Sequence, residues 1–173
     1  MGLKNLEQIV LLVTDVDGVM TDGRILVTDQ GETKAFSVRD GLGIKLMQKA
    51  GVEVAILSGR ASVPLMERAR ELGIKHVKTG RLDKQTALEE IMQAAGVHAG
   101  QVAYIGDDLP DIAPLQMAAA AFCPQDAAAE VCAVADLVVP IDGGRGVVRH
   151  VAEVILKAQG AWAPMVQAFE VRP

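Results

Sequence analysis

The stretch Ile9-Val-Leu-Leu-Val-Thr-Asp-Val-Asp-Gly18 changes abruptly from apolar to acidic residues. Its first part is a continuous run of β-branched residues and leucines, which is typical of a strand buried on both faces of a parallel sheet. Two carboxylates follow, and residues i and i+2 that leave an extended strand point the same way. Gly18 then allows the chain to turn sharply. The stretch therefore predicts a central strand, 9–14, that brings Asp15 and Asp17 to one edge of a sheet.

Strand-like and helical segments alternate along the rest of the chain. Gly51, Gly73 and Gly96 follow three of the helical segments and act as stop signals. This alternation predicts an α/β fold, a Rossmann-like doubly wound sheet that is mostly parallel and covered on both faces. The further predicted strands are 52–57, 76–78, 102–105, 120–122 and 137–139, and the predicted helices are 41–50, 62–72, 83–95, 111–118, 127–134 and 147–159.

One segment interrupts the alternation. Residues 24–38 contain two short extended runs around Asp29-Gln30-Gly31, which predicts a small β-hairpin inserted after the first strand. A chain of 173 residues suffices for one core, so residues 1–159 are expected to form a single domain. The tail, 160–173, has no clear period and is expected to be mobile or docked on something else.

Composition argues against several classes of function. A net charge of −5 and an aromatic content of 3% do not suit binding to nucleic acid. The apolar run at 9–13 is too short for a membrane span or a signal peptide, so no membrane partner and a cytoplasmic location are expected. Cys123 and Cys132 are too far apart in sequence to indicate a zinc site or a redox pair. We expect both to be small, buried hydrophobic side chains.

Polar residues follow several predicted strands. Ser58-Gly59-Arg60 and Gly106-Asp-Asp-Leu-Pro-Asp111 each begin where a strand ends, and Asp83-Lys84 opens a helix. In an open parallel sheet, ligands bind beyond the carboxyl ends of the strands. Hard oxygen ligands and a cation are what a complex of Mg²⁺ and phosphate requires. The pattern therefore favours phosphoryl chemistry, although Asp15-Val-Asp-Gly18 by itself would also fit an ordinary strand-ending turn.

Four motifs, in this order, resemble those of the haloacid dehalogenase superfamily: Asp15-Val-Asp-Gly-Val-Met-Thr21, Ser58, Lys84 and Gly106-Asp-Asp-Leu-Pro-Asp111. The resemblance implies a Mg²⁺-dependent phosphomonoester hydrolase. In it, Asp15 forms an aspartyl-phosphate, and Asp17 protonates the leaving alkoxide and then activates water. Ser58 and Lys84 would hold phosphoryl oxygens. Asp107 would ligate the metal together with Asp15 and the Asp17 carbonyl.

The segments Val38-Arg-Asp-Gly-Leu-Gly43, Leu57-Ser-Gly-Arg60, Glu67-Arg68 and Gly143-Gly-Arg-Gly146 resemble a narrower family. This family is the 3-deoxy-D-manno-octulosonate 8-phosphate phosphatases of lipopolysaccharide synthesis, and the similarity spans nearly the whole chain up to about the last helix, without the tail 160–173. These enzymes lack a cap domain, which fits the predicted hairpin. The resemblance implies a small phosphorylated sugar acid as substrate and a homotetramer with active sites at subunit interfaces.

Three arginines are candidates for substrate binding, together with Gly59. Arg60 could bind the substrate carboxylate, and Arg68 could do so across a subunit boundary, but solvated helix arginines are an equally good interpretation of both. Arg145 stands among three glycines before a helix N-terminus, a place suited to anions or, alternatively, to a flexible turn.

Three aspartates are expected to have supporting roles. Asp40 is predicted to cap the helix that begins beside it. Asp111 is expected to brace the loop of the fourth motif, and the resemblance implies that Asp108 supports the metal site, directly or through water. The three histidines share no ligand spacing.

Two other functions remain open from the sequence. A phosphatase of a nine-carbon ulosonate 9-phosphate would carry the same catalytic motifs. A phosphoacceptor receiver module also places aspartates and a lysine at strand ends, but its acceptor aspartate stands alone on the third strand. Here the D-x-D pair follows the first strand, and the double aspartate follows the fourth of the predicted parallel strands.

Overall fold

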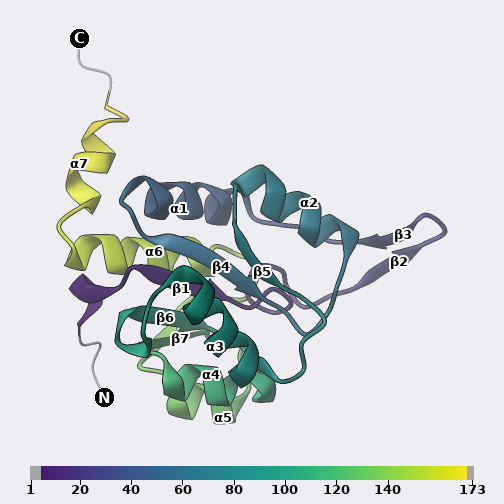
Figure 1. Ribbon diagram of the computed structural model, residues 1–173. Helices are drawn as coiled ribbons and strands as arrows, with labels where there is room; N and C mark the ends of the chain where they lie inside the picture. The colour runs from purple at the N-terminus through teal and green to yellow at the C-terminus, as the bar shows by residue number, and fades with distance from the viewer. Residues whose placement is uncertain (1–4, 171–173) are drawn as a thin grey trace.

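The computed structural model describes residues 5–170, which form a six-stranded parallel sheet flanked by helices. The strand order β5-β4-β1-β6-β7-β8 confirms the predicted doubly wound α/β fold (Figure 1). The strands are β1 (Leu11–Thr14), β4 (Glu53–Leu57), β5 (His76–Lys78), β6 (Val102–Ile105), β7 (Ala120–Pro124) and β8 (Leu137–Val139).

Helices cover both faces of this sheet (Figure 1). One face holds α1 (Val38–Lys49), α2 (Val63–Leu72) and α6 (Val147–Ala158), and the other holds α3 (Lys84–Ala95), α4 (Ile112–Met117) and α5 (Ala129–Val134). The β1 side chains alternate between two apolar clusters, because successive residues of a strand face opposite sides. Leu12 joins the cluster on the α1 and α6 side, whereas Leu11 and Val13 join the other.

The order of the strands reverses at β1. The chain runs outward from β1 through β4 to β5, and then crosses back to β6 on the other side of β1. In doubly wound sheets such a reversal opens a crevice at the carboxyl ends of the strands, where ligands bind. The residues that follow β1 and β6 therefore have the best place for chemistry.

A β-hairpin stands where the sequence predicts it. Strands β2 (Leu26–Thr28) and β3 (Gly31–Thr33) pair antiparallel and extend away from the main sheet (Figure 1). Short 3₁₀ turns at Leu6–Gln8 (η1), Ala99–Gln101 (η2) and Leu109–Asp111 (η3) complete the order of elements.

The prediction that Asp40 caps its own helix is wrong. The N-cap of α1 is Ser37, whose hydroxyl accepts hydrogen bonds from the backbone N–H groups of Arg39 and Asp40. The Asp40 carboxylate instead accepts a 2.8 Å hydrogen bond from the backbone N–H of Arg149, in the first turn of α6. The N-cap of α6 is Gly146, which offers no side chain, so Asp40 supplies a capping carboxylate from a different helix.

The tail contains a short helix, α7 (Trp162–Gln167), that continues beyond α6 (Figure 1). The Trp162 ring lies beneath two cations of α6, with the guanidinium of Arg149 at 5.1 Å and the ammonium of Lys157 at 5.6 Å from its centroid. Such cation–π contacts hold the start of α7 against α6. Residues 171–173 of the predicted tail lie outside the described residues.

The two cysteines are closer in space than their sequence separation suggests. Cys123 is buried on β7, Cys132 is half-buried on α5, and their sulfur atoms are 3.9 Å apart. Burial, followed by the neighbouring Cys132, raises the pKa of Cys123 to about 12. Cys123 is therefore a protonated, apolar side chain near neutral pH, as the sequence predicts.

Candidate active site

Three elements deliver a lysine and two carboxylates to the carboxyl edge of the sheet. Asp15 directly follows β1. Its backbone N–H donates a 2.9 Å hydrogen bond to the carbonyl of Ile105, which extends the pairing of β1 with β6. Asp107 comes two residues after the end of β6. Lys84 is the first residue of α3 and is buried, with its Nζ 3.0 Å from Oδ2 of Asp15. These predicted residues therefore meet at the point where the strand order reverses.

Asp111 belongs to the same cluster. Carboxylate oxygens of Asp15, Asp107 and Asp111 all lie within 4.8 Å of one another. Asp111 Oδ1 accepts hydrogen bonds from Lys84 Nζ and from the hydroxyl of Tyr104, each at 2.7 Å. Its Oδ2 accepts from the backbone N–H groups that precede η3. Both oxygens are thus engaged within the protein, so Asp111 is placed to brace the loop and to orient Lys84.

The crowding of carboxylates changes their protonation. Burial, and then the charge of Asp111, raises the pKa of Asp15 to about 6, although Lys84 opposes the shift. Burial and the charges of Asp15 and Asp111 raise the pKa of Asp107 to about 8. Burial and the neighbouring carboxylates therefore disfavour the charged forms of Asp15 and Asp107 more than Lys84 favours them.

The donor set fits a divalent cation. Asp107 Oδ1 is buried and has no hydrogen-bond partner among residues 5–170. A buried, unpaired carboxylate oxygen beside a second carboxylate is costly unless a cation binds it. Oxygen donors of this kind suit Mg²⁺. Asp15 and Asp107 are the two side chains placed to hold such an ion.

Position 18 requires a glycine, because the Asp107 carboxylate lies directly against its backbone. The φ of Gly18 is +93°, a conformation that favours glycine, and a Cβ atom built on it would collide with the Asp107 carboxylate. The turn after β1 therefore passes directly against the residue that follows β6.

Asp17 does not join the carboxylate cluster. Its Oδ1 pairs with the ammonium of Lys34, a residue just after β3, and Arg60 Nε lies 3.9 Å from its Oδ2. Lys34 carries no signal in the sequence that would predict this contact, because no motif or helical spacing marks it. Ser58 is buried after β4, where its Oγ accepts a 3.2 Å hydrogen bond from the backbone N–H of Arg60.

The other predicted residues make contacts outside the cluster of Asp15, Lys84, Asp107 and Asp111. Gly59 and Arg60 follow Ser58, and Arg60 is half-exposed and bonded to Glu32 of the hairpin at 3.0 Å. Arg68 is engaged within its own chain, at 2.8 Å from Glu71 and 3.3 Å from the carbonyl of Ser37. Asp108 is exposed and accepts from the backbone N–H of Leu109.

Arg145 is held near the turn after β1 by its glycine neighbours. The backbone N–H of Gly144 donates to the carbonyl of Val19 at 2.9 Å, and a Cβ at Gly144 would lie 2.6 Å from the backbone of Thr21 and Asp22. Arg145 itself is exposed and lines, with Asp22 and Arg39, a surface hollow of about 470 Å³.

Comparisons with known proteins show the family to which this chain belongs. Residues 76–151 match the family model of haloacid dehalogenase-like hydrolases. The 3-deoxy-D-manno-octulosonate 8-phosphate phosphatase KdsC of Haemophilus influenzae is 45% identical over 91% of this chain and 88% of its own length. The KdsC of Yersinia pestis is 44% identical over 86% of this chain and 80% of its own length. The chain belongs to the 3-deoxy-D-manno-octulosonate 8-phosphate phosphatase family.

Solved structures of this phosphatase family share the fold. The Moraxella catarrhalis enzyme, solved with a magnesium ion, a phosphate ion and a KDO molecule, superposes with a TM-score of 0.93. It is 40% identical and covers 96% of each chain. The cobalt-bound Haemophilus influenzae enzyme superposes with a TM-score of 0.88 at 45% identity, over 91% of this chain and 92% of its own. Membership in the phosphatase family favours a hydrolase over the receiver module.

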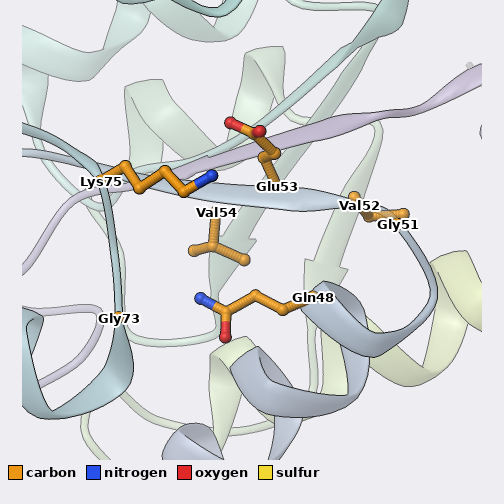
Figure 2. A pocket seen from close by; sticks show the side chains of 7 residues that line it. All are labelled: Gln48, Gly51, Val52, Glu53, Val54, Gly73 and Lys75. Carbon is orange, nitrogen blue, oxygen red and sulfur yellow. The ribbon is translucent and has the colours of Figure 1, made fainter.

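Two further features lie apart from the site. A hollow of about 360 Å³ is lined by Gln48, Glu53 and Lys75 near the amino ends of β4 and β5, away from the carboxyl edge (Figure 2). Within residues 5–170, every helix falls short of the length and apolar character that a membrane crossing demands.

Proposed function

We propose that this protein hydrolyses 3-deoxy-D-manno-octulosonate 8-phosphate to the free sugar acid and inorganic phosphate. One observation carries the proposal: Asp15, Lys84 and Asp107 meet at the carboxyl edge of β1 and β6, in a chain 45% identical to a KdsC phosphatase. The Moraxella relative, which binds magnesium, phosphate and KDO, supports the same substrate class.

In the first half of the reaction, Asp15 attacks phosphorus and the bond between phosphorus and the C8 oxygen breaks. Asp17 donates a proton to the departing alkoxide, which leaves as the sugar hydroxyl. In the second half, Asp17 takes a proton from water, which attacks the aspartyl-phosphate and releases phosphate and the free Asp15 carboxylate. Asp15 pairs with Lys84 inside the carboxylate cluster, whereas Asp17 pairs with Lys34 outside it, so the two carboxylates can take separate tasks.

Two further side chains bind phosphoryl oxygens in this proposal. The ammonium of Lys84, which bridges Asp15 and Asp111, is placed to contact phosphoryl oxygens. Burial disfavours the charge of Lys84, but the neighbouring Asp15 and Asp111 outweigh it and raise its pKa, so the lysine stays cationic. Ser58 Oγ accepts from a backbone N–H, so its own proton is free to donate to phosphate.

Mg²⁺ is the proposed cofactor, and Asp15, Asp107 and the Asp17 carbonyl would hold it. Bound there, it would supply Lewis-acid polarisation of the phosphoryl group and would offset the charge of the crowded carboxylates.

The experiment that tests this function is steady-state phosphate release across C5 to C9 phosphosugars with Mg²⁺ present. We expect the highest kcat/KM for 3-deoxy-D-manno-octulosonate 8-phosphate. A higher kcat/KM for a nine-carbon ulosonate 9-phosphate would replace this substrate with the sialic-acid-like alternative. Release from neither compound would refute the proposed function.

We also propose that the protein acts in lipopolysaccharide precursor synthesis in the cytoplasm, as a homotetramer. The hairpin supports the assembly, because Leu26 is 55% and Val27 is 81% exposed, and exposed apolar side chains mark interaction surfaces. In the tetramer, Arg68 would contact the substrate bound to a neighbouring subunit, and Arg145 would contact the substrate or the tail. Light scattering coupled to gel filtration tests this: a tetramer is expected, and an active monomer at all concentrations would contradict it.

A further inference from the structure

Lys34 contacts the carboxylate that the proposed mechanism uses as acid and base. It lies one residue beyond β3, in the chain that leaves the hairpin, and its ammonium pairs with Oδ1 of Asp17. The same ammonium lies 3.2 Å from Oε1 of Glu32. A residue just beyond the hairpin therefore reaches back to the turn after β1.

This lysine is placed with little freedom. Its side chain is 1% exposed, whereas the side chains of Asp17 and Glu32 are each 20% exposed. A buried ammonium is unfavourable unless carboxylates or other acceptors pair with it. Since Lys34 can satisfy its charge only on these two neighbours among the described residues, its position and the orientation of Asp17 are fixed together.

The two oxygens of Asp17 have different surroundings. Lys34 pairs with Oδ1, and the Thr21 hydroxyl lies 3.5 Å from that same atom. Oδ2 has a distant neighbour in Arg60 Nε at 3.9 Å, and the Arg60 side chain is 49% exposed. The contacts thus hold one oxygen of the carboxylate and leave the other accessible.

We propose that Lys34 is a positioning residue, which fixes Asp17 through Oδ1 so that Oδ2 exchanges the proton with the leaving group and with water. The proposal rests on the proposed function, in which Asp17 is the acid and base. It assigns a role to the hairpin within its own subunit. Glu32 supports Lys34 from β3 and bonds Arg60 Nη2 at 3.0 Å, so the hairpin and the segment after β4 meet at Asp17.

The test uses leaving groups that differ in their need for a proton. An alkyl phosphate such as the ulosonate 8-phosphate requires protonation of its leaving oxygen, but p-nitrophenyl phosphate does not. The parameter to compare is kcat/KM, because it reports the steps up to the first irreversible one and is insensitive to the later attack of water. Lys34→Met should lower kcat/KM for the ulosonate 8-phosphate by about 100-fold, and for p-nitrophenyl phosphate by less than about threefold.

Three variants make the result specific. Lys34→Arg should recover most of the loss, because its guanidinium can donate to the same oxygen. Lys75→Met makes the same chemical change at the exposed lysine of Figure 2 and should leave both substrates near the wild-type values. Glu32→Gln keeps an oxygen beside Lys34 and should reduce the alkyl reaction less than Lys34→Met does.

Two outcomes would overturn the proposal. Equal losses on both substrates in Lys34→Met would mean that Lys34 supports the fold or binds the phosphoryl group. A loss on the ulosonate phosphate that does not extend to an alkyl phosphate without a carboxylate, such as arabinose 5-phosphate, would mean that Lys34 binds the substrate carboxylate. If the wild-type protein leaves the ulosonate phosphate intact, the proposed substrate fails, while arabinose 5-phosphate against p-nitrophenyl phosphate still tests Lys34.

Discussion

The Asp40 carboxylate on α1 accepts a 2.8 Å hydrogen bond from the backbone N–H of Arg149 on α6. The two residues are 109 positions apart in the chain. Asp40 is buried, and its Oδ2 has no hydrogen-bond partner among the described residues. The contact thus joins two helices that cover the same face of the sheet, at the cost of a half-satisfied buried carboxylate.

This contact predicts how stability depends on pH. Burial raises the pKa of Asp40 from 3.8 to about 6, although backbone N–H groups of Arg149 and Val148 oppose the shift. Between these values the folded protein binds more protons than the unfolded chain, so this group lowers stability as pH rises from about 4 to about 6. The size of the effect is about 3 kcal/mol at most. Above about pH 6 the destabilisation by Asp40 stays constant.

Asp40→Asn should remove this dependence. The free energy of unfolding of the variant minus that of the wild type, measured by urea denaturation, should rise between pH 4 and pH 6 and then level off. Asp29→Asn, at the exposed tip of the hairpin, is the matched control and should show no such rise. A difference that is flat across this range would show that burial does not disfavour the Asp40 charge.

Asp15→Asn should abolish catalysis without unfolding the protein. The amide keeps the shape of the side chain but cannot attack phosphorus, so kcat should fall by more than about 1,000-fold. Phosphate release is the measurement. The oligomeric state should be unchanged, and the thermal unfolding midpoint should be unchanged or higher, because a crowded carboxylate is removed. Turnover near the wild-type rate would exclude Asp15 as nucleophile.

Removal of Mg²⁺ should stop phosphate release reversibly. Chelation by EDTA should abolish activity and excess Mg²⁺ should restore it, since Asp15 and Asp107 need a cation to offset their charges. Mg²⁺ should also raise the thermal midpoint of the wild type, as any ligand of the folded state does. Asp107→Asn should raise the Mg²⁺ concentration that gives half of this increase by at least about tenfold. An unchanged concentration would place the ion elsewhere.

Alanine substitutions at Gly18 and Gly31 distinguish the effect of backbone strain from that of steric crowding. Both have positive φ, at +93° and +114°, but a Cβ at Gly31 meets no atom within 4 Å, whereas one at Gly18 collides with the Asp107 carboxylate. Gly31→Ala should therefore cost about 1–2 kcal/mol of stability and leave the catalytic centre intact. Gly18→Ala should add a loss of kcat and of Mg²⁺ affinity, because Asp107 must move. Unfolding curves and magnesium titrations of the pair distinguish the two effects.

The sequence by itself determined the fold class and the main catalytic candidates. Alternation of buried strands with helices fixes a parallel sheet, and residues directly after strands must lie at its carboxyl edge. Asp15, Ser58 and Asp107 are therefore placed by local position alone, and Lys84 by its place at a helix start. The hairpin was predictable for the same reason, because a turn and two short extended runs are local signals.

Only the tertiary structure decided which side chains meet. Lys34 reaches Asp17 from 17 residues away, and Asp40 caps a helix that begins more than 100 residues later. Neither pairing leaves a periodic signal, because a side-chain contact between distant segments depends on how helices and hairpin pack. Asp15 and Asp17 thus follow from the chain order, whereas the lysine that orients Asp17 follows from the packing of the hairpin against the turn after β1.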